Sequence, residues 1–205
     1  MDTMETIESL IRWIGGLAAL VVIIIVLISV RRFRSRPAGK TVGSSPARLY
    51  SPAFLVIASL ISIGICVLLW RPIPVTLPPW AQVTALGLGA LLYFSGIALL
   101  LWGRQALGKF HNVSSSQGVQ LFADHELITN GPFAYVRHPM YLGTALMYLA
   151  TPVALGSWWA LLPALLIVPI LVLRILNEEK VLAEQLPGYR EYTQKIRYRL
   201  IPGVW

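Results

Sequence analysis

Long apolar runs separated by short polar stretches dominate this sequence. Two of the runs, residues 10–30 and 83–102, are close to the length of about twenty residues that an α-helix needs to cross a bilayer. Three shorter runs follow the same pattern, at residues 53–70, 140–155 and 158–176. The pattern predicts an all-α integral membrane bundle with about five transmembrane helices.

The last two apolar runs predict a helical hairpin. Gly156 and Ser157 separate them, and such a pair favours a tight turn. A long polar stretch, residues 103–138, precedes the hairpin, and a polar tail, residues 177–205, follows it. Because the runs are closely spaced, we expect a single membrane domain covering residues 1–205.

Composition and charge support a membrane protein. Hydrophobic residues make up 56% of the chain and charged residues only 13%, whereas soluble domains carry about 25% charged residues. The net charge of +8 comes from basic residues beside the apolar runs, where they mark the cytoplasmic side and meet anionic lipids. We therefore expect a multi-pass membrane protein with an outer N-terminus and a cytoplasmic C-terminus.

The same features argue against several other partners. A nucleic-acid reader needs a polar element that enters a groove, and none is visible. No obligate protein partner is evident either. Cys66 is the only cysteine, and the spacing of His111 and His125 fits no common zinc pattern, so we predict no metal site.

Candidate chemistry begins just before the hairpin. The segment Asn130-Gly131-Pro132 has the residues of a turn, because glycine permits positive φ and proline fixes the φ that follows. Pro139 suits the first turn of the next helix. Arg137 and His138 should therefore lie at a helix N-terminus at the membrane face, where backbone donors and the dipole favour an anion.

Two acidic residues lie at the other end of the predicted hairpin. Glu178 and Glu179 follow the last apolar run, so we expect them at the C-terminus of its helix. A hairpin returns its end to the side where it began, which should bring both acids near Arg137 and His138. Two interpretations remain open: a site for an amino-acid zwitterion, or a salt bridge that closes the hairpin.

An ordered set of motifs resembles a known superfamily. The set comprises residues 127–133 (LITNGPF), residues 137–143 (RHPMYLG), Glu178-Glu179, then Leu182, Gly188-Tyr189, Tyr192 and residues 197–202 (RYRLIP). It resembles the isoprenylcysteine carboxyl methyltransferase and phospholipid methyltransferase superfamily over roughly residues 121–202. The short first loop and the small size resemble a prokaryotic member of that superfamily, which implies a prokaryotic inner membrane. The resemblance implies an S-adenosylmethionine site outside the Rossmann fold, formed by about residues 121–145 and 174–202.

The resemblance also implies roles for individual residues. The cofactor-binding candidates are Gly131, Pro132, Tyr135, Arg137, His138, Pro139, Tyr141, Gly143, Glu178 and Glu179. Within this set, His138, Tyr141 and Gly143 would line the pocket, and Glu178 and Glu179 would frame the methionine ammonium. The C-terminal segment would fold over the cofactor and present Tyr192, Arg197 and Arg199 to the acceptor as catalytic candidates.

The implied reaction is an in-line displacement at the sulfonium methyl group, which rests on alignment and on exclusion of water. The acceptor would be lipophilic and would enter from the bilayer lipids: an isoprenylcysteine carboxylate, a phospholipid or a small hydrophobic molecule. Two other functions compete with this hypothesis. One is an NADPH-dependent membrane reductase of the sterol reductase type, and the other is a non-catalytic membrane protein.

Overall fold

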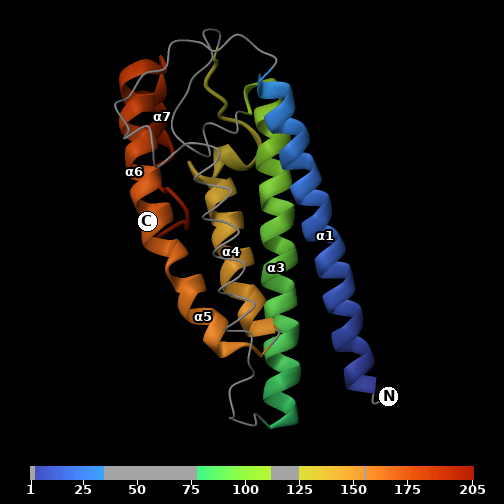
Figure 1. Cartoon of the computed structure of the whole chain (residues 1–205). Helices are drawn as coiled ribbons and strands as arrows, with labels where there is room; N and C mark the ends of the chain where they lie inside the picture. Colours follow the sequence, from blue (N-terminus) through green and yellow to red (C-terminus); the bar gives the residue numbers. More distant parts are fainter. Residues whose placement is uncertain (1–2, 35–77, 112–124, 155) are drawn as a thin grey trace.

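The computed structural model describes residues 3–34, 78–111, 125–154 and 156–205, and every regular element in these ranges is helical. Figure 1 shows long helices running side by side. The elements are α1 (Thr3–Arg34), α3 (Pro79–Leu107), α4 (Pro139–Ala154), α5 (Trp158–Leu165), α6 (Ile167–Gln185) and α7 (Tyr189–Lys195), with 3-10 turns η1 (Gly108–Phe110) and η3 (Gly131–Ala134).

The helices follow the apolar runs. Helix α1 contains the expected span 10–30, α3 contains 83–102, and α4 covers most of 140–155. The expected span 53–70 lies outside the described residues. The all-helical fold class is confirmed for the described part of the chain, whereas the number of transmembrane helices stays a prediction.

Among the residues that the structure describes, two helical stretches, Pro79–Phe110 and Ala160–Gln185, are long and apolar enough to cross a membrane. Only 22% and 24% of their most apolar windows are buried within the protein. Large apolar side chains therefore face outward, as Leu88 and Leu173 do with 55% and 63% of their surface exposed. A soluble protein rarely exposes an apolar surface of this extent, so the outward faces fit a hydrocarbon environment.

Helices α3 and α4 pack backbone to backbone. A Cβ atom on Gly143 would lie 2.6 Å from the carbonyl oxygen of Gly96, and one on Gly96 would lie 2.7 Å from that of Gly143. Farther along, a Cβ on Gly89 would lie 2.6 Å from the Cβ of Ala154. Small residues at these crossings allow the close approach by which membrane helices associate.

The hairpin turns where the sequence predicts. Gly156 has a φ of 63°, and the amide of Ser157 donates to the carbonyl of Pro152 at 2.9 Å. Beyond the turn the second arm is broken at Leu166, which separates α5 from α6. Pro169 accounts for the break, because its ring lacks an N–H and clashes with the carbonyl four residues earlier.

Helix α6 continues well past the expected end of the last run at residue 176. It ends at Gln185, so Glu178 and Glu179 lie within the helix and the expectation that they sit at its C-terminus is wrong. The residues after 176 include Glu, Lys, Leu and Ala, all good helix formers, and the first breakers are Pro187 and Gly188. The hydropathy pattern therefore marks the end of the apolar segment, whereas the breakers mark the end of the helix.

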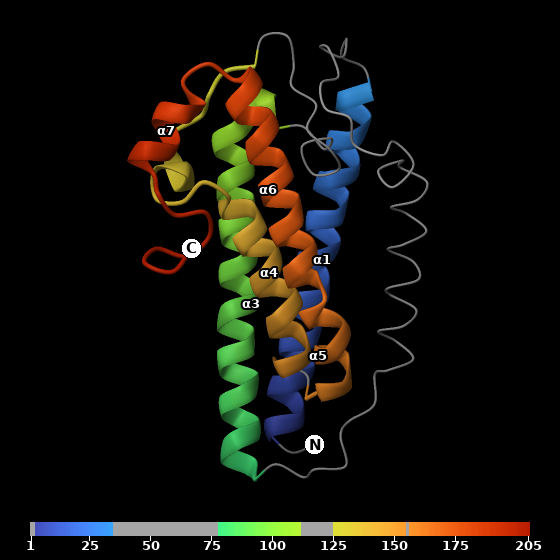
Figure 2. The same cartoon turned by 90° about the vertical axis from the view of Figure 1, so that its left-hand side faces the viewer.

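The C-terminal part folds back toward the start of α4. Figure 2 shows α7 beside η3, with the last residues descending next to the bundle. Helix α7 is anchored by a small apolar core of Leu186, Tyr189 and Tyr192, against which Leu127 and Leu182 pack. This packing brings the tail to the residues that precede α4.

Candidate functional site

The candidate site begins at the turn before α4. Gly131 has a φ of 59°, as its place in an Asn-Gly-Pro turn predicts, and it starts η3. A Cβ there would lie 3.1 Å from the Cβ of Ala106, so the turn lies close against α3. Pro132 and Pro139 are fully buried, and Pro139 begins α4 as expected. These residues fix the position of the Arg137–His138 pair between them.

The side chains of Arg137 and His138 point toward α6, where both contact the carboxylate of Glu179. Nε of Arg137 lies 2.8 Å from Oε1 of Glu179, and Nε2 of His138 lies 3.2 Å from the same oxygen. The first contact is an ion pair by distance, although the Nε–H direction is not aligned for a hydrogen bond. The predicted approach of the two ends of the hairpin is confirmed.

The tail adds a third cation to Glu179. Nε of Arg199 donates to Oε2 of Glu179 at 2.9 Å. The Glu179 side chain is 13% exposed, against 7% for Arg137 and 28% for Arg199. One carboxylate thus lies between guanidinium groups from two distant segments, and both of its oxygens are engaged within the chain.

The backbone of the tail runs alongside the start of α4. The amide of Arg137 donates to the carbonyl of Tyr198 at 3.0 Å, and that of His138 donates to the carbonyl of Arg199 at 2.9 Å. These two amides therefore bind carbonyls of the tail, whereas the expectation that the N-terminus of α4 favours an anion stays a prediction. Nη1 of Arg137 also approaches the carbonyl of Ile196 at 3.3 Å.

A second series of hydrogen-bonded side chains lies beside the contacts of Glu179. Tyr141 donates its hydroxyl to Oε2 of Glu178 at 2.6 Å, and Arg174 donates its Nε–H to the Tyr141 oxygen at 2.9 Å. The ring centroids of His138 and Tyr141 are 5.7 Å apart, so the contacts of Glu179 and those of Tyr141 form one group of side chains. We call this group the charged cluster; its members are Arg137, His138, Tyr141, Arg174, Glu178, Glu179 and Arg199.

Tyr192 lies at the edge of the charged cluster and ties α7 to η3. Its hydroxyl donates to the carbonyl of Phe133 at 2.7 Å. Burial raises the pKa of Tyr192 to about 12, and burial also raises the pKa of the neighbouring Tyr189. Tyr192 therefore acts as a neutral hydrogen-bond donor at physiological pH.

Gly131, Pro132, Pro139 and Tyr192 border the charged cluster without belonging to it, whereas Tyr135, Gly143 and Arg197 face elsewhere. Tyr135 is 67% exposed and its ring lies 6.4 Å from that of Trp102. Gly143 faces Gly96 in the α3–α4 contact, and Arg197 is exposed. The sequence prediction also missed one member, Arg174. Its signal was a cation within an apolar helix, one turn before Glu178.

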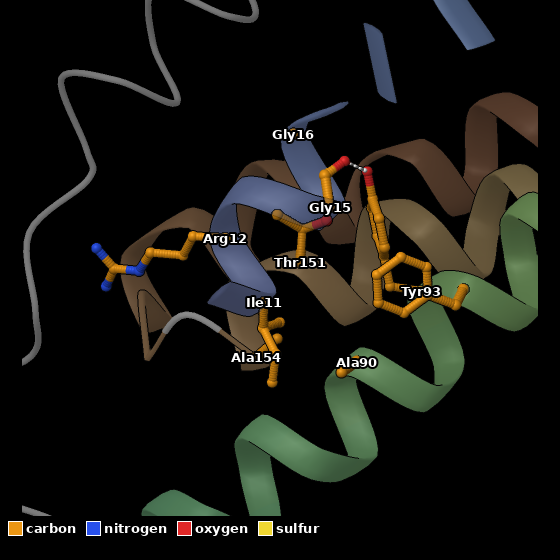
Figure 3. A pocket seen from close by; sticks show the side chains of 9 residues that line it. Ile11, Arg12, Gly15, Gly16, Ala90, Tyr93, Thr151 and Ala154 are labelled. Atoms are coloured by element: carbon orange, nitrogen blue, oxygen red, sulfur yellow. Dashed lines mark hydrogen bonds between the residues drawn. The ribbon is translucent and has the colours of Figure 1, made fainter. Parts of the chain in front are cut away.

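An apolar cavity lies apart from the charged cluster. It has a volume of about 210 Å³ and is lined by residues of α1, α3 and α4, including Ile11, Ala90 and Ala154. Figure 3 shows Tyr93 at its edge, where the phenol donates to the carbonyl of Gly15 at 3.1 Å. No residue of the charged cluster lines this cavity.

Comparison with known proteins points to a region that contains every member of the charged cluster except Arg199. A sequence profile described as phospholipid methyltransferase matches residues 84–187, just over half of the chain. The protein-S-isoprenylcysteine O-methyltransferase of Schizosaccharomyces pombe is 32% identical over 117 residues. The alignment covers 56% of this chain and 47% of that protein, so the chain spans about half the length of the relative that it matches.

Proposed function

The chain belongs to the phospholipid methyltransferase family, and we propose that it transfers a methyl group from S-adenosylmethionine to a lipophilic acceptor in the membrane. The proposal includes a multi-pass arrangement with the charged cluster at the cytoplasmic face. A single observation carries it: Glu179 gathers Arg137, His138 and Arg199 into one site, and Glu179, Arg137 and His138 lie within the matched residues 84–187.

The donor set of the charged cluster fits the methionine end of S-adenosylmethionine. That end carries both an ammonium and a carboxylate group, so its site must offer charges of both signs. Glu178 supplies a carboxylate, and Arg137 and Arg199 supply guanidinium groups that suit carboxylates through paired N–H donors. When bound, S-adenosylmethionine would supply a methyl group on a sulfonium, which is already a good leaving group.

The protein's own residues would bind, align and exclude water. The ring of His138 is held by burial, since the residue is only 5% exposed. The ring of Tyr141 is held by its hydroxyl, which accepts a hydrogen bond from Arg174 and donates one to Glu178. The tail segment from Ile196 to Arg199 covers the start of α4 by accepting hydrogen bonds from the backbone of Arg137 and His138 and from the Arg137 side chain. Catalysis by such a site would depend on positioning and on a dry environment.

The direct test is binding of S-adenosylhomocysteine, measured by calorimetry on the full chain in detergent. We expect micromolar binding by the wild-type protein and weaker binding by Glu178→Gln, which removes one carboxylate charge while keeping the shape of the side chain. Glu184→Gln is the matched control, because Glu184 is exposed on the same helix. It should bind like the wild type.

NADPH serves as the control ligand in the same titration. Binding of NADPH in place of S-adenosylhomocysteine would overturn the proposal in favour of a reductase. Failure of the wild-type protein to bind either molecule would overturn it in favour of a non-catalytic membrane protein. A methyl-transfer assay with membrane extracts then identifies the acceptor class.

A further inference from the structure

Arg174 carries a charge near the middle of an apolar helical stretch. It lies in α6 within Ala160–Gln185, the most apolar of the candidate membrane spans. Its neighbours Ile170 and Leu173 are 56% and 63% exposed, so this part of the helix presents hydrocarbon to its surroundings. A cation at such a depth is costly and is kept where it binds a partner or a ligand.

The partners of Arg174 within the protein satisfy only part of its guanidinium group. Nε donates to the hydroxyl of Tyr141 at 2.9 Å, and the guanidinium carbon lies 5.7 Å from the centre of that ring. Glu178 is one turn further along α6, yet it is reached through the Tyr141 hydroxyl rather than by a direct ion pair. Nη2 of Arg174 is buried with no hydrogen-bond partner among the described residues.

The charge balance around Arg174 leaves room for an anion. The charged cluster holds three guanidinium groups, those of Arg137, Arg174 and Arg199, against the two carboxylates of Glu178 and Glu179. Glu179 is already shared by the other two arginines. A buried guanidinium N–H group without an acceptor destabilises the folded protein, and an anionic oxygen of a ligand would supply the missing hydrogen bond.

We propose that Arg174 binds the anionic group, a carboxylate or a phosphate, of the membrane-dissolved methyl acceptor. The inference rests on the proposed function and names a residue that recognises the acceptor. Arg174 lies about 6 Å deeper along α6 than Glu178, toward the middle of the apolar stretch. A ligand that reaches this depth comes from the bilayer, whereas a water-soluble cofactor meets the polar end. Its planar guanidinium suits both carboxylate and phosphate.

The test compares three amphiphiles with one hydrocarbon chain: oleate, oleyl phosphate and oleyl alcohol. Binding of each tritiated probe to the full-length protein is measured in a neutral maltoside detergent by scintillation proximity. We expect at least one anionic probe to bind the wild type about tenfold more tightly than the alcohol. Arg174→Gln should abolish this preference while still binding S-adenosylhomocysteine, with an affinity lowered by no more than about tenfold through the lost hydrogen bond to Tyr141.

Two further variants keep the test decisive if Arg174→Gln fails to fold. Arg174→Lys retains the charge and should keep part of the anion preference. Lys180→Gln removes one positive charge from an exposed position on the same helix and should leave the preference unchanged. The order of oleate and oleyl phosphate in the wild type distinguishes a carboxylate acceptor from a phospholipid.

Several outcomes would overturn the proposal. They are equal binding of all three probes by the wild type, an unchanged preference in Arg174→Gln, or a complete loss of S-adenosylhomocysteine binding in that variant, which would assign Arg174 to the cofactor. If the wild type preferred anions but bound no S-adenosylhomocysteine, the proposed function would fail, and the ligand of Arg174 would not be a methyl acceptor. This result differs from the three above, in which the assignment of Arg174 itself fails.

Discussion

Nε of Arg199 lies 2.9 Å from Oε2 of Glu179, and this contact joins the C-terminal tail to the middle of helix α6. The other oxygen of the same carboxylate contacts Arg137 at the start of α4. One side chain therefore connects three segments that are far apart in the sequence. Because backbone hydrogen bonds at Arg137 and His138 hold the tail at the same place, the tail and the hairpin form one unit.

Replacing Glu179 with glutamine should destabilise the protein by about 2 kcal/mol. The change leaves the guanidinium of Arg137, which is 7% exposed, without its counter-charge, and loss of one partner of a buried pair costs several kcal/mol. Partial exposure of Arg199 reduces that cost. We expect a lower midpoint of thermal unfolding in detergent and faster cleavage of the tail by added protease.

Glu184→Gln provides the comparison for that measurement, since it makes the same chemical change at an exposed position of α6. It should shift the midpoint little. If both variants unfolded at the same temperature as the wild type, the carboxylate of Glu179 would not be the connection between tail and hairpin.

Tyr192→Phe should loosen α7 from η3 at a cost of about 1 kcal/mol. The hydroxyl of Tyr192 donates to the carbonyl of Phe133 at 2.7 Å, and removing it leaves that carbonyl without this donor. Tyr198→Phe is the control, because Tyr198 is 40% exposed. Hydrogen exchange of the amides in residues 131–136 should accelerate in the first variant and not in the second. Equal exchange in the two variants would contradict the proposed tie.

The sequence was sufficient to predict that Arg137 and His138 meet a glutamate. Two apolar runs joined by Gly156-Ser157 must form a hairpin, and a hairpin brings its two ends together whatever its detailed packing. The turn at Gly131 and the start of α4 at Pro139 could also be predicted, because each follows from the residue types of a short segment. These features depend on residue type and order, so they can be read without a structure.

The remaining parts of the site depend on how the tail and α6 are aligned against α4, which the residue pattern does not predict. Which tail carbonyl faces the amide of His138 is decided by the length of α7 and by the packing of Tyr189 and Tyr192. The bridge from Arg174 through Tyr141 requires the rotation of α6 against α4. That rotation follows a break at Leu166, and the simple apolar pattern of residues 158–176 hides it.

Gly143→Ala should destabilise the α3–α4 contact by about 2 kcal/mol. The added methyl group would lie 2.6 Å from the carbonyl oxygen of Gly96 and 3.1 Å from the amide nitrogen of Leu100, so helix backbones must separate. Gly87→Ala is a matched control, because a Cβ there meets no atom within 4 Å. Alanine at that position should be neutral or stabilising by up to about 1 kcal/mol. Thermal unfolding of both variants in one detergent checks this, and equal destabilisation would show that the crossing at Gly143 is not close.

Lowering the pH should destabilise the protein through His111, in the window between pH 6.5 and about 4. Burial, followed by the positive charge of Arg104, lowers the pKa of His111 to about 4. The unfolded chain keeps an ordinary value near 6.5. Above pH 6.5 the imidazole is neutral in both states and has no effect on stability. As the pH falls through the window, the unfolded state takes up a proton that the folded state does not, so the free energy of unfolding decreases.

The contribution of His111 is isolated by subtraction, because carboxylates also titrate in this range. Thermal unfolding is followed from pH 7.5 to pH 4 for the wild type and for His111→Gln, which cannot be protonated. The wild type should lose more stability than the variant on acidification, and the difference between their midpoints should grow steadily below pH 6.5. Parallel curves for the two proteins would mean that His111 has the same proton affinity folded and unfolded, and that its burial against the end of α3 does not exclude the charged imidazolium.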